Sequence, residues 1–234
     1  GIPQLFESEN RLQSLRIDKI GDEFGVNYII KGSGDEYQRL KEIKATGNSF
    51  ILPLSFPQPY DVSDPFDATN ISLEELKHWE MAPANPYLLN KEGIPIAFTS
   101  KGLKDPSEFG DQLRKAVSYG LPPEAALKAC TFTPATLLGI ADQVGSLKKG
   151  MVANFIITSG DLFKKDNIIF ENWVQGKPYV INQSNVEDIR GEYDLLLNQN
   201  TTYRLLISGV VHDLKAKIAH GTDTINATVG FTNY

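Results

Sequence analysis

The first half of the chain alternates short apolar stretches with longer amphipathic ones. The apolar stretches are bounded by turn residues, which is typical of strands, and they fall at residues 4–7, 26–30, 50–54 and 94–99. Helical patterns lie between and after them: residues 9–24 and 35–46, stretches that open at Ser72, Asp105 and Thr133, and residues 123–130. Strands that alternate with helices predict parallel βαβ units, and therefore an α/β fold.

Local signals support these helices. Residues 9–24 place Leu12, Leu15 and Ile20 on one side, and Gly25 is suited to end that helix in a left-handed conformation. Ser72 is followed three residues later by glutamate, which is the spacing of a capping box.

The second half changes to the period of antiparallel strands. Strands are predicted at residues 154–158, 168–174 and 178–182, with a hairpin turn at Gln175-Gly176 between the last two. After Gly191 we expect three or four more strands, among them residues 193–197, 203–208 and 225–231. The pattern divides the chain into residues 1–142, 143–190 and 191–234, the last being the start of an additional β-rich module or a linker.

Composition narrows the classes of function. The 234 residues carry a formal net charge of −6 with scattered basic residues, so nucleic-acid binding is not expected. No apolar run approaches the roughly 20 residues of a membrane span, and the first residues do not have the pattern expected of a signal peptide. A single cysteine, Cys130, excludes an internal disulfide framework, and we expect it to be buried and inert. A soluble protein of the cytoplasm or periplasm fits, and the compartment stays open.

A specific resemblance lies in residues 117–161. The turn residues there are Thr131-Phe132-Thr133-Pro134-Ala135, Leu138-Gly139, Gly145-Ser146-Leu147, Lys149-Gly150 and Ala153-Asn154. In order and spacing this stretch resembles the C-terminal part of the amidohydrolase superfamily, in its imidazolonepropionase-like branch. Asn154 stands where that pattern usually has Asp.

The resemblance implies a metal-dependent hydrolase of non-peptide C–N bonds on a (β/α)8 barrel with a small β-sandwich. Zinc or another divalent metal in that family polarises the carbonyl and lowers the pKa of bound water to about 7. Residues 1–142 would then be a partial TIM-type barrel made of the last four βα units. A small β-sandwich segment at 143–190 and the additional antiparallel strands would follow.

The family's metal ligands have no counterparts at the expected strand ends. The fifth-strand position falls at residues 6–9, the sixth at 30–32 and the eighth at 100–101, and these hold neither His nor Asp. We therefore expect no metal or other cofactor in this segment. Lys31 and Lys101 would repel a divalent ion, and an ion pair with Glu7 or Glu9 would neutralise them.

Three functional hypotheses remain open. The first is a fragment of an amidohydrolase with no activity on its own, for which Glu7, Glu9, Lys31 and Lys101 are weak catalytic candidates. The second is a metal-free pseudoenzyme that binds a polar or anionic small molecule through Lys31, Ser55 and Lys101. The third is a half-barrel that binds phosphate through the amides of Gly32 to Gly34, although a tight turn is the preferred interpretation of that stretch.

The histidines give weaker signals. His78 is predicted to be packed or capping rather than catalytic. His212 and His220, beside Asp213 and Asp223, could form a metal site, but their spacing matches no ligand motif.

A cut barrel exposes two sheet edges, which invite pairing with another strand. We therefore expect the rest of the same polypeptide, or a second copy, to complete the barrel.

Overall fold

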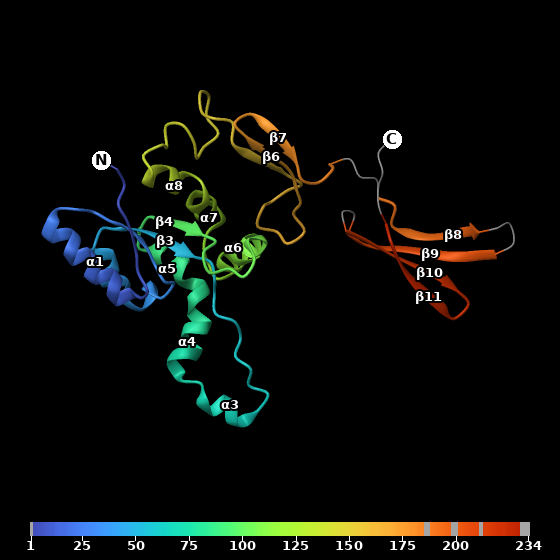
Figure 1. Cartoon of the computed structure of the whole chain (residues 1–234), viewed down its shortest axis with the longest axis horizontal. Coiled ribbons are helices and arrows are strands. Elements are labelled where there is room, and N and C mark those ends of the chain that lie inside the picture. The colour runs from blue at the N-terminus through green and yellow to red at the C-terminus, as the bar shows by residue number, and fades with distance from the viewer. Residues whose placement is uncertain (1, 185–187, 198–200, 211–212, 230–234) are drawn as a thin grey trace.

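The computed structural model describes residues 2–184, 188–197, 201–210 and 213–229. Figure 1 shows three sheets that follow one another along the chain. The first sheet is parallel, has the order β1-β2-β3-β4, and consists of Leu5–Glu7, Ile29–Lys31, Ser49–Pro53 and Ile96–Thr99. The predicted α/β fold is confirmed, and the sheet is open rather than closed into a barrel among the described strands.

Helices connect and cover these strands. They are α1 (Arg11–Phe24), the 3₁₀ turn η1 (Glu36–Arg39), α2 (Leu40–Ala45), α3 (Pro65–Asn70), α4 (Leu73–Met81), η2 (Ala82–Ala84), α5 (Asn85–Lys91), η3 (Pro106–Glu108), α6 (Phe109–Ser118), α7 (Pro123–Cys130) and α8 (Phe132–Leu137). The predicted capping box forms, because the Ser72 side chain accepts from the Glu75 amide and the Glu75 carboxylate accepts from the Ser72 amide. Gly25 ends α1 at φ 64°, as expected.

The core lies between the sheet and its helices. Ile30, Phe50 and Ile96 are register partners on neighbouring strands, and all three are buried. Ile43 of α2 and Leu89 of α5 belong to the same buried cluster. Full burial of each such side chain is worth about 1.5–3 kcal/mol, so this row of strand residues holds the helices on the sheet.

The second strand is shorter than predicted. We expected it to start at Val26, but β2 begins at Ile29. The Val26 amide donates to the carbonyl of Gly21 at 2.8 Å as part of the end of α1, so it is not available to a sheet.

The second sheet is antiparallel and contains β5 (Phe155–Thr158), β6 (Ile169–Val174) and β7 (Lys177–Val180). The predicted hairpin turn is confirmed, with Gln175 at φ 52° and Gly176 at φ 77°. Phe155 stacks on Trp173 with their ring centroids 5.2 Å apart. The described strands of this region form a single sheet, whereas a β-sandwich, which has two packed sheets, was predicted for it.

The third sheet is antiparallel in the order β11-β10-β9-β8, from Asp223–Thr228, Asp213–His220, Thr201–Val210 and Gly191–Leu197. The four strands of this sheet agree with the expectation of three or four strands after Gly191. Residues 230 and 231, to which the last strand was predicted to extend, lie outside the described residues.

One face of the third sheet is more apolar than the other. Tyr193, Leu205, Ile218 and Ile225 are consecutive register partners across its four strands. The neighbouring row on the other face contains Glu192, Leu206, Lys217 and Asn226. Each sheet falls within one of the three predicted ranges, while the division into domains stays a prediction.

Candidate functional site

The carboxyl ends of the first sheet's strands carry a cluster of charged side chains. Glu7 is the last residue of β1 and is the register partner of Lys31, the last residue of β2. Lys101 follows β4, and its amide donates to the Thr99 hydroxyl at 3.2 Å, which turns the chain over the sheet edge. These three residues are called the Glu7 cluster below.

Both lysines bind the same carboxylate. Lys31 Nζ donates to Glu7 Oε1 at 2.7 Å. Lys101 Nζ lies 2.7 Å from Glu7 Oε1 and 2.6 Å from Oε2. The ion pair predicted from the sequence is therefore confirmed, with Glu7 as the acidic partner.

Glu9 takes no part in this cluster. It lies beyond the end of β1, where the chain bends toward α1, and its amide donates to the Gln13 side chain at 2.6 Å. In the described part of the chain Glu9 makes no ion pair with Lys31 or Lys101. Because β1 ends at Glu7, Glu9 lies outside the strand and does not share its alternation of side chains.

The lysines change the chemistry of the carboxylate. Hydrogen bonds from Lys101 and then Lys31 lower the pKa of Glu7 from 4.5 to about 2. Glu7 is therefore ionised at neutral pH and holds no proton to donate as a general acid. Two ammonium groups and one carboxylate leave the cluster with one net positive charge.

This donor set does not fit a divalent metal. Both Glu7 oxygens already face ammonium groups, which are donors without a lone pair to offer. Over the residues that the structure describes, no three His, Cys, Asp or Glu side chains come together in a group that could hold a metal ion.

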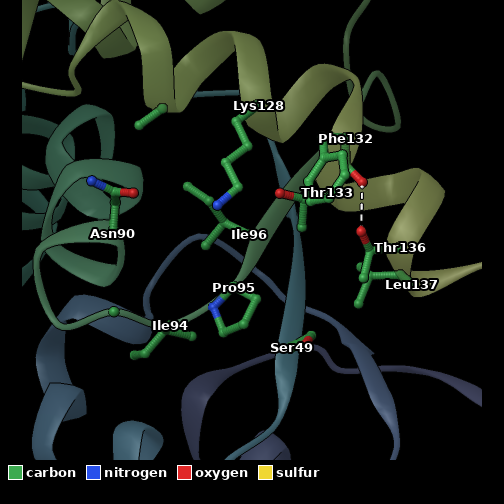
Figure 2. Close-up of a pocket in the computed structure, with 12 residues that line it drawn as sticks. Ser49, Asn90, Ile94, Pro95, Ile96, Lys128, Phe132, Thr133, Thr136 and Leu137 are labelled. Atoms are coloured by element: carbon green, nitrogen blue, oxygen red, sulfur yellow. Dashed lines mark hydrogen bonds between the residues drawn. The ribbon is translucent and has the colours of Figure 1, made fainter. Parts of the chain in front are cut away.

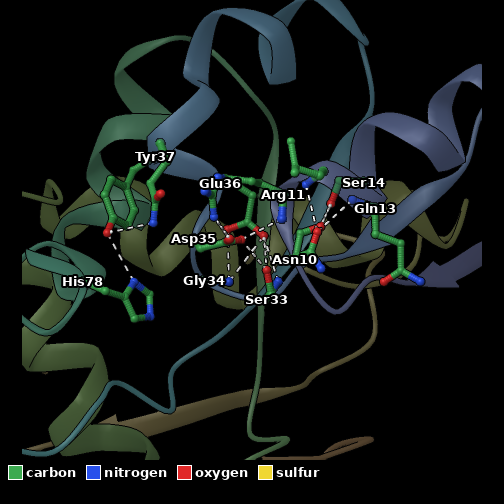
Figure 3. Close-up of polar contacts among 12 residues, drawn as sticks. Asn10, Arg11, Gln13, Ser14, Ser33, Gly34, Asp35, Glu36, Tyr37 and His78 are labelled. Atoms are coloured by element: carbon green, nitrogen blue, oxygen red, sulfur yellow. Dashed lines mark hydrogen bonds and ion pairs between the residues drawn. The ribbon is translucent and has the colours of Figure 1, made fainter. Parts of the chain in front are cut away.

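The turn after β2 contains its own anion. Figure 3 shows the Glu36 carboxylate inside the turn. The Ser33 amide donates to Glu36 Oε1 at 2.8 Å, the Gly34 amide donates to Oε2 at 3.1 Å, and the Gly32 amide donates to the Ile51 carbonyl at 3.0 Å. Because all three amides have internal acceptors, the phosphate-binding hypothesis for this turn is wrong and the tight-turn interpretation is confirmed.

Glu36 is a residue that sequence reasoning missed. It is fully buried, and the Asn85 side-chain amide donates to its second oxygen at 2.7 Å. Burial raises the pKa of Glu36, and the hydrogen bonds from the turn and from Asn85 oppose that shift. A Cβ atom at Gly32 would lie 2.2 Å from Glu36 Oε1, so the first glycine makes room for the carboxylate.

His78 is packed, as expected. Its Nδ1 lies 3.2 Å from the Tyr37 hydroxyl, and the two rings are stacked with centroids 6.1 Å apart (Figure 3). Tyr37 belongs to η1, so this contact joins α4 to the turn that contains Glu36.

Ser55 lines a pocket beside the carboxyl ends of β3 and β4. The pocket has a volume of about 440 Å³ and is lined by residues that follow β3 and β4 and by residues of α4 and α6. No member of the Glu7 cluster lines it. The binding role predicted for Lys31, Ser55 and Lys101 together stays a prediction.

A further pocket, of about 380 Å³, lies at the opposite end of the strands. Figure 2 shows Ser49 and Ile96, where β3 and β4 begin, beneath Lys128 of α7 and Phe132 of α8. In parallel α/β folds the amino ends of the strands are associated with stability rather than with chemistry.

The remaining candidates are separated from these sites. His212 lies outside the described residues, and the His220 ring packs on Tyr203 with centroids 4.8 Å apart. Cys130 is half-buried rather than fully buried as expected, and loss of solvent around its thiol raises the pKa of Cys130 to about 11, which keeps the thiol protonated.

The comparisons agree with the arrangement of strands and helices. The model of the amidohydrolase family matches residues 68–186, which is just over half of the chain. The chain belongs to the amidohydrolase family.

Solved structures show the same fold. An amidohydrolase from Thermotoga maritima superposes with a TM-score of 0.60 at 23% identity, over 75% of this chain and 43% of that one. A prolidase complexed with N-methylphosphonate-L-proline has a TM-score of 0.54 at 14% identity, over 75% and 44% of the two chains. This chain therefore spans less than half of either relative. The search of curated proteins found no match to this chain.

None of the helices among the described residues is long and apolar enough to span a membrane.

Proposed function

We propose that this chain is the last four βα units of an amidohydrolase barrel and takes part in hydrolysis of non-peptide C–N bonds only with the rest of that barrel. The observation that carries this proposal is the Glu7 cluster. The cluster lies at the carboxyl ends of the strands, where enzymes of this architecture have their active sites. Its three side chains are paired with one another there. Metal ligands, where the protein has them, come from outside these 234 residues. The imidazolonepropionase-like branch stays a prediction from residues 117–161.

The proposal is tested by metal analysis of the longest natural polypeptide that contains this segment. About one or two zinc, manganese or iron ions per chain, together with hydrolysis of a C–N bond, are expected for a working site. The variant Glu7→Gln should leave the metal content unchanged, because Glu7 binds lysines and not an ion. A polypeptide that loses its metal with this substitution would contradict the assignment.

A second candidate is a metal-free pseudoenzyme that binds a polar or anionic small molecule. The net positive charge of the Glu7 cluster supports it, since a second carboxylate could share the two ammonium groups. Succinate is a suitable probe, with calorimetric titration of the chain and of Lys31→Ala and Lys101→Ala variants. Equal affinity in all three proteins would remove the basis of this candidate.

We also propose that another strand completes the first sheet, supplied by the rest of the polypeptide or by a second copy. Among the described strands, β1 and β4 each have one neighbour in the sheet. Leu5 of β1 is 58% exposed, which leaves an apolar side chain on an open edge. Sedimentation velocity over a wide concentration range tests self-pairing, and a monomer throughout would leave the rest of the polypeptide as the partner.

A further inference from the structure

We propose that the pocket at the amino ends of β3 and β4 binds an organic anion, namely a carboxylate that carries an apolar group. This pocket lies at the opposite end of the strands from the Glu7 cluster, so the inference does not rest on the proposed hydrolysis. Its volume of about 380 Å³ is within the range of small-molecule sites.

The first reason is a cation without an acidic partner. Among the described residues that line the pocket, Lys128 alone is charged, and it pairs with no carboxylate elsewhere in the described chain. Its Nζ lies 5.9 Å from the centroid of the Phe132 ring, which belongs to the same lining. A carboxylate in the pocket would therefore meet an ammonium group and no like charge.

The second reason is a group of polar side chains without partners of their own. Ser49 of β3, Asn90 of α5 and Thr133 of α8 line the pocket, and none of their side chains forms a hydrogen bond with a described residue. Figure 2 shows the Lys128 Nζ between the Asn90 carboxamide and the Thr133 hydroxyl. Hydroxyl and carboxamide groups both donate hydrogen bonds. Together with Lys128, these side chains bring donors from four separate elements of the fold to one anion.

The third reason is the apolar remainder of the lining, which sets the class of the anion. The apolar side chains of the lining are Ile94, Pro95, Ile96, Ala125, Phe132 and Leu137. A ligand that places an apolar group against this wall removes that group from water and gains affinity, whereas an inorganic anion gains nothing there. The wall therefore favours an organic carboxylate over phosphate or sulfate.

The experiment is a titration of the ¹⁵N-labelled chain with phenylacetate, observed at the Asn90 side-chain amide and the Thr133 backbone amide. Two matched compounds separate the contributions: phenylacetamide keeps the ring and loses the charge, and acetate keeps the carboxylate and loses the ring. We expect saturable shifts at both positions with phenylacetate, at a Kd on the order of 1 mM for a ligand of this size. Phenylacetamide and acetate should each bind at least about tenfold more weakly.

Variants assign the binding to this pocket. Lys128→Met should weaken phenylacetate by about tenfold, to the affinity of phenylacetamide, because the charged hydrogen bond is lost. Lys115→Met is the matched control and should leave the affinity unchanged. Lys115 Nζ also lies over an aromatic ring, 5.7 Å from the centroid of Phe56, but Lys115 is outside the lining. Thr133→Val, which keeps the shape and removes the hydroxyl, should weaken phenylacetate by about threefold.

The outcomes separate recognition of an anion from nonspecific binding. Shifts that require the charge, the ring and Lys128 would support the proposal. Equal affinity for phenylacetate and phenylacetamide would mean that no anion is recognised, and equal affinity for phenylacetate and acetate would mean that the apolar wall takes no part. Either result would overturn the proposal, as would unmoved resonances up to about ten times the expected Kd or an unchanged affinity in Lys128→Met.

Discussion

The buried carboxylate of Glu36 should be a main support of the β2–η1 turn. The perturbation is Glu36→Gln, which keeps the size of the side chain and replaces one oxygen by an amide. The native carboxylate accepts from the Ser33 and Gly34 amides and from the Asn85 side chain, at distances of 2.7 to 3.1 Å. All of these groups are donors, so the site is built for an acceptor.

The glutamine cannot satisfy them all. If its oxygen faces the turn amides, its NH2 group faces the NH2 group of Asn85. Asn85 cannot rotate to present its oxygen instead, because that oxygen already accepts from the Tyr37 amide at 2.8 Å. At least one buried donor is therefore unpaired, at about 1–3 kcal/mol, and the remaining bonds lose their charge. We expect a total destabilisation of about 2–4 kcal/mol.

Urea unfolding at pH 8, with hydrogen exchange of the Ser33 and Gly34 amides as the local measurement, gives the magnitude. Glu42→Gln is the control, since Glu42 makes an exposed i,i+3 pair with Arg39, and it should cost at most about 0.5 kcal/mol. Adding Asn85→Asp to Glu36→Gln should restore at least about 1 kcal/mol, because the new carboxylate accepts from both the glutamine and Tyr37. A Glu36→Gln effect no larger than the control, or no recovery in the double variant, would refute the reasoning.

Three further predictions concern Glu7, Cys130 and Gly145. The Glu7 carboxyl should titrate near pH 2 by ¹³C NMR, and a pKa near 4.5 would exclude the ion pairs. Because folding lowers this pKa from 4.5, the contribution of Glu7 to stability is present above pH 4.5 and is lost as the pH falls toward 2. Cys130 should react with a thiol reagent at pH 8 at least about tenfold more slowly in the folded chain than in urea, and equal rates would contradict its burial. Gly145→Ala should lower the free energy of unfolding by more than about 1 kcal/mol, because φ is +92° and the new Cβ would lie 2.8 Å from the Cβ of Ala135. The control Gly160→Ala should be near neutral, because a Cβ there would meet nothing within 4 Å. Equal losses of stability in the two variants would contradict this account.

Much of the fold could be predicted from sequence because its signals are local. The capping box at Ser72, the left-handed Gly25 and the hairpin at Gln175-Gly176 each depend on neighbouring residues only. The contact of Glu7 with Lys31 was predictable for another reason, since the carboxyl ends of adjacent parallel strands meet at one edge. Lys101 follows β4, which is not a neighbour of β1 in the sheet, so strand adjacency alone does not account for its contact with Glu7.

What could not be predicted depends on contacts between distant residues. Glu36 reads as one acidic residue among many until Asn85, 49 positions away, brings a donor to it. The close approach of the loop after β4 to Ser55 is of the same kind, because it joins Gly102 to a residue far from it in the sequence. The periodicity of apolar residues in the sequence does not indicate which face of such a loop is turned toward the residues that it contacts.

The sharing of one carboxylate by two lysines also constrains how this sequence can change over evolutionary time. Loss of Lys31 or Lys101 alone leaves a neutral pair, so either lysine can drift first. Loss of Glu7 while both lysines remain leaves two neighbouring cations without a counter-ion. Substitutions at these three positions are therefore ordered, and in descendants of this chain Glu7 should not be the first of the three to be replaced.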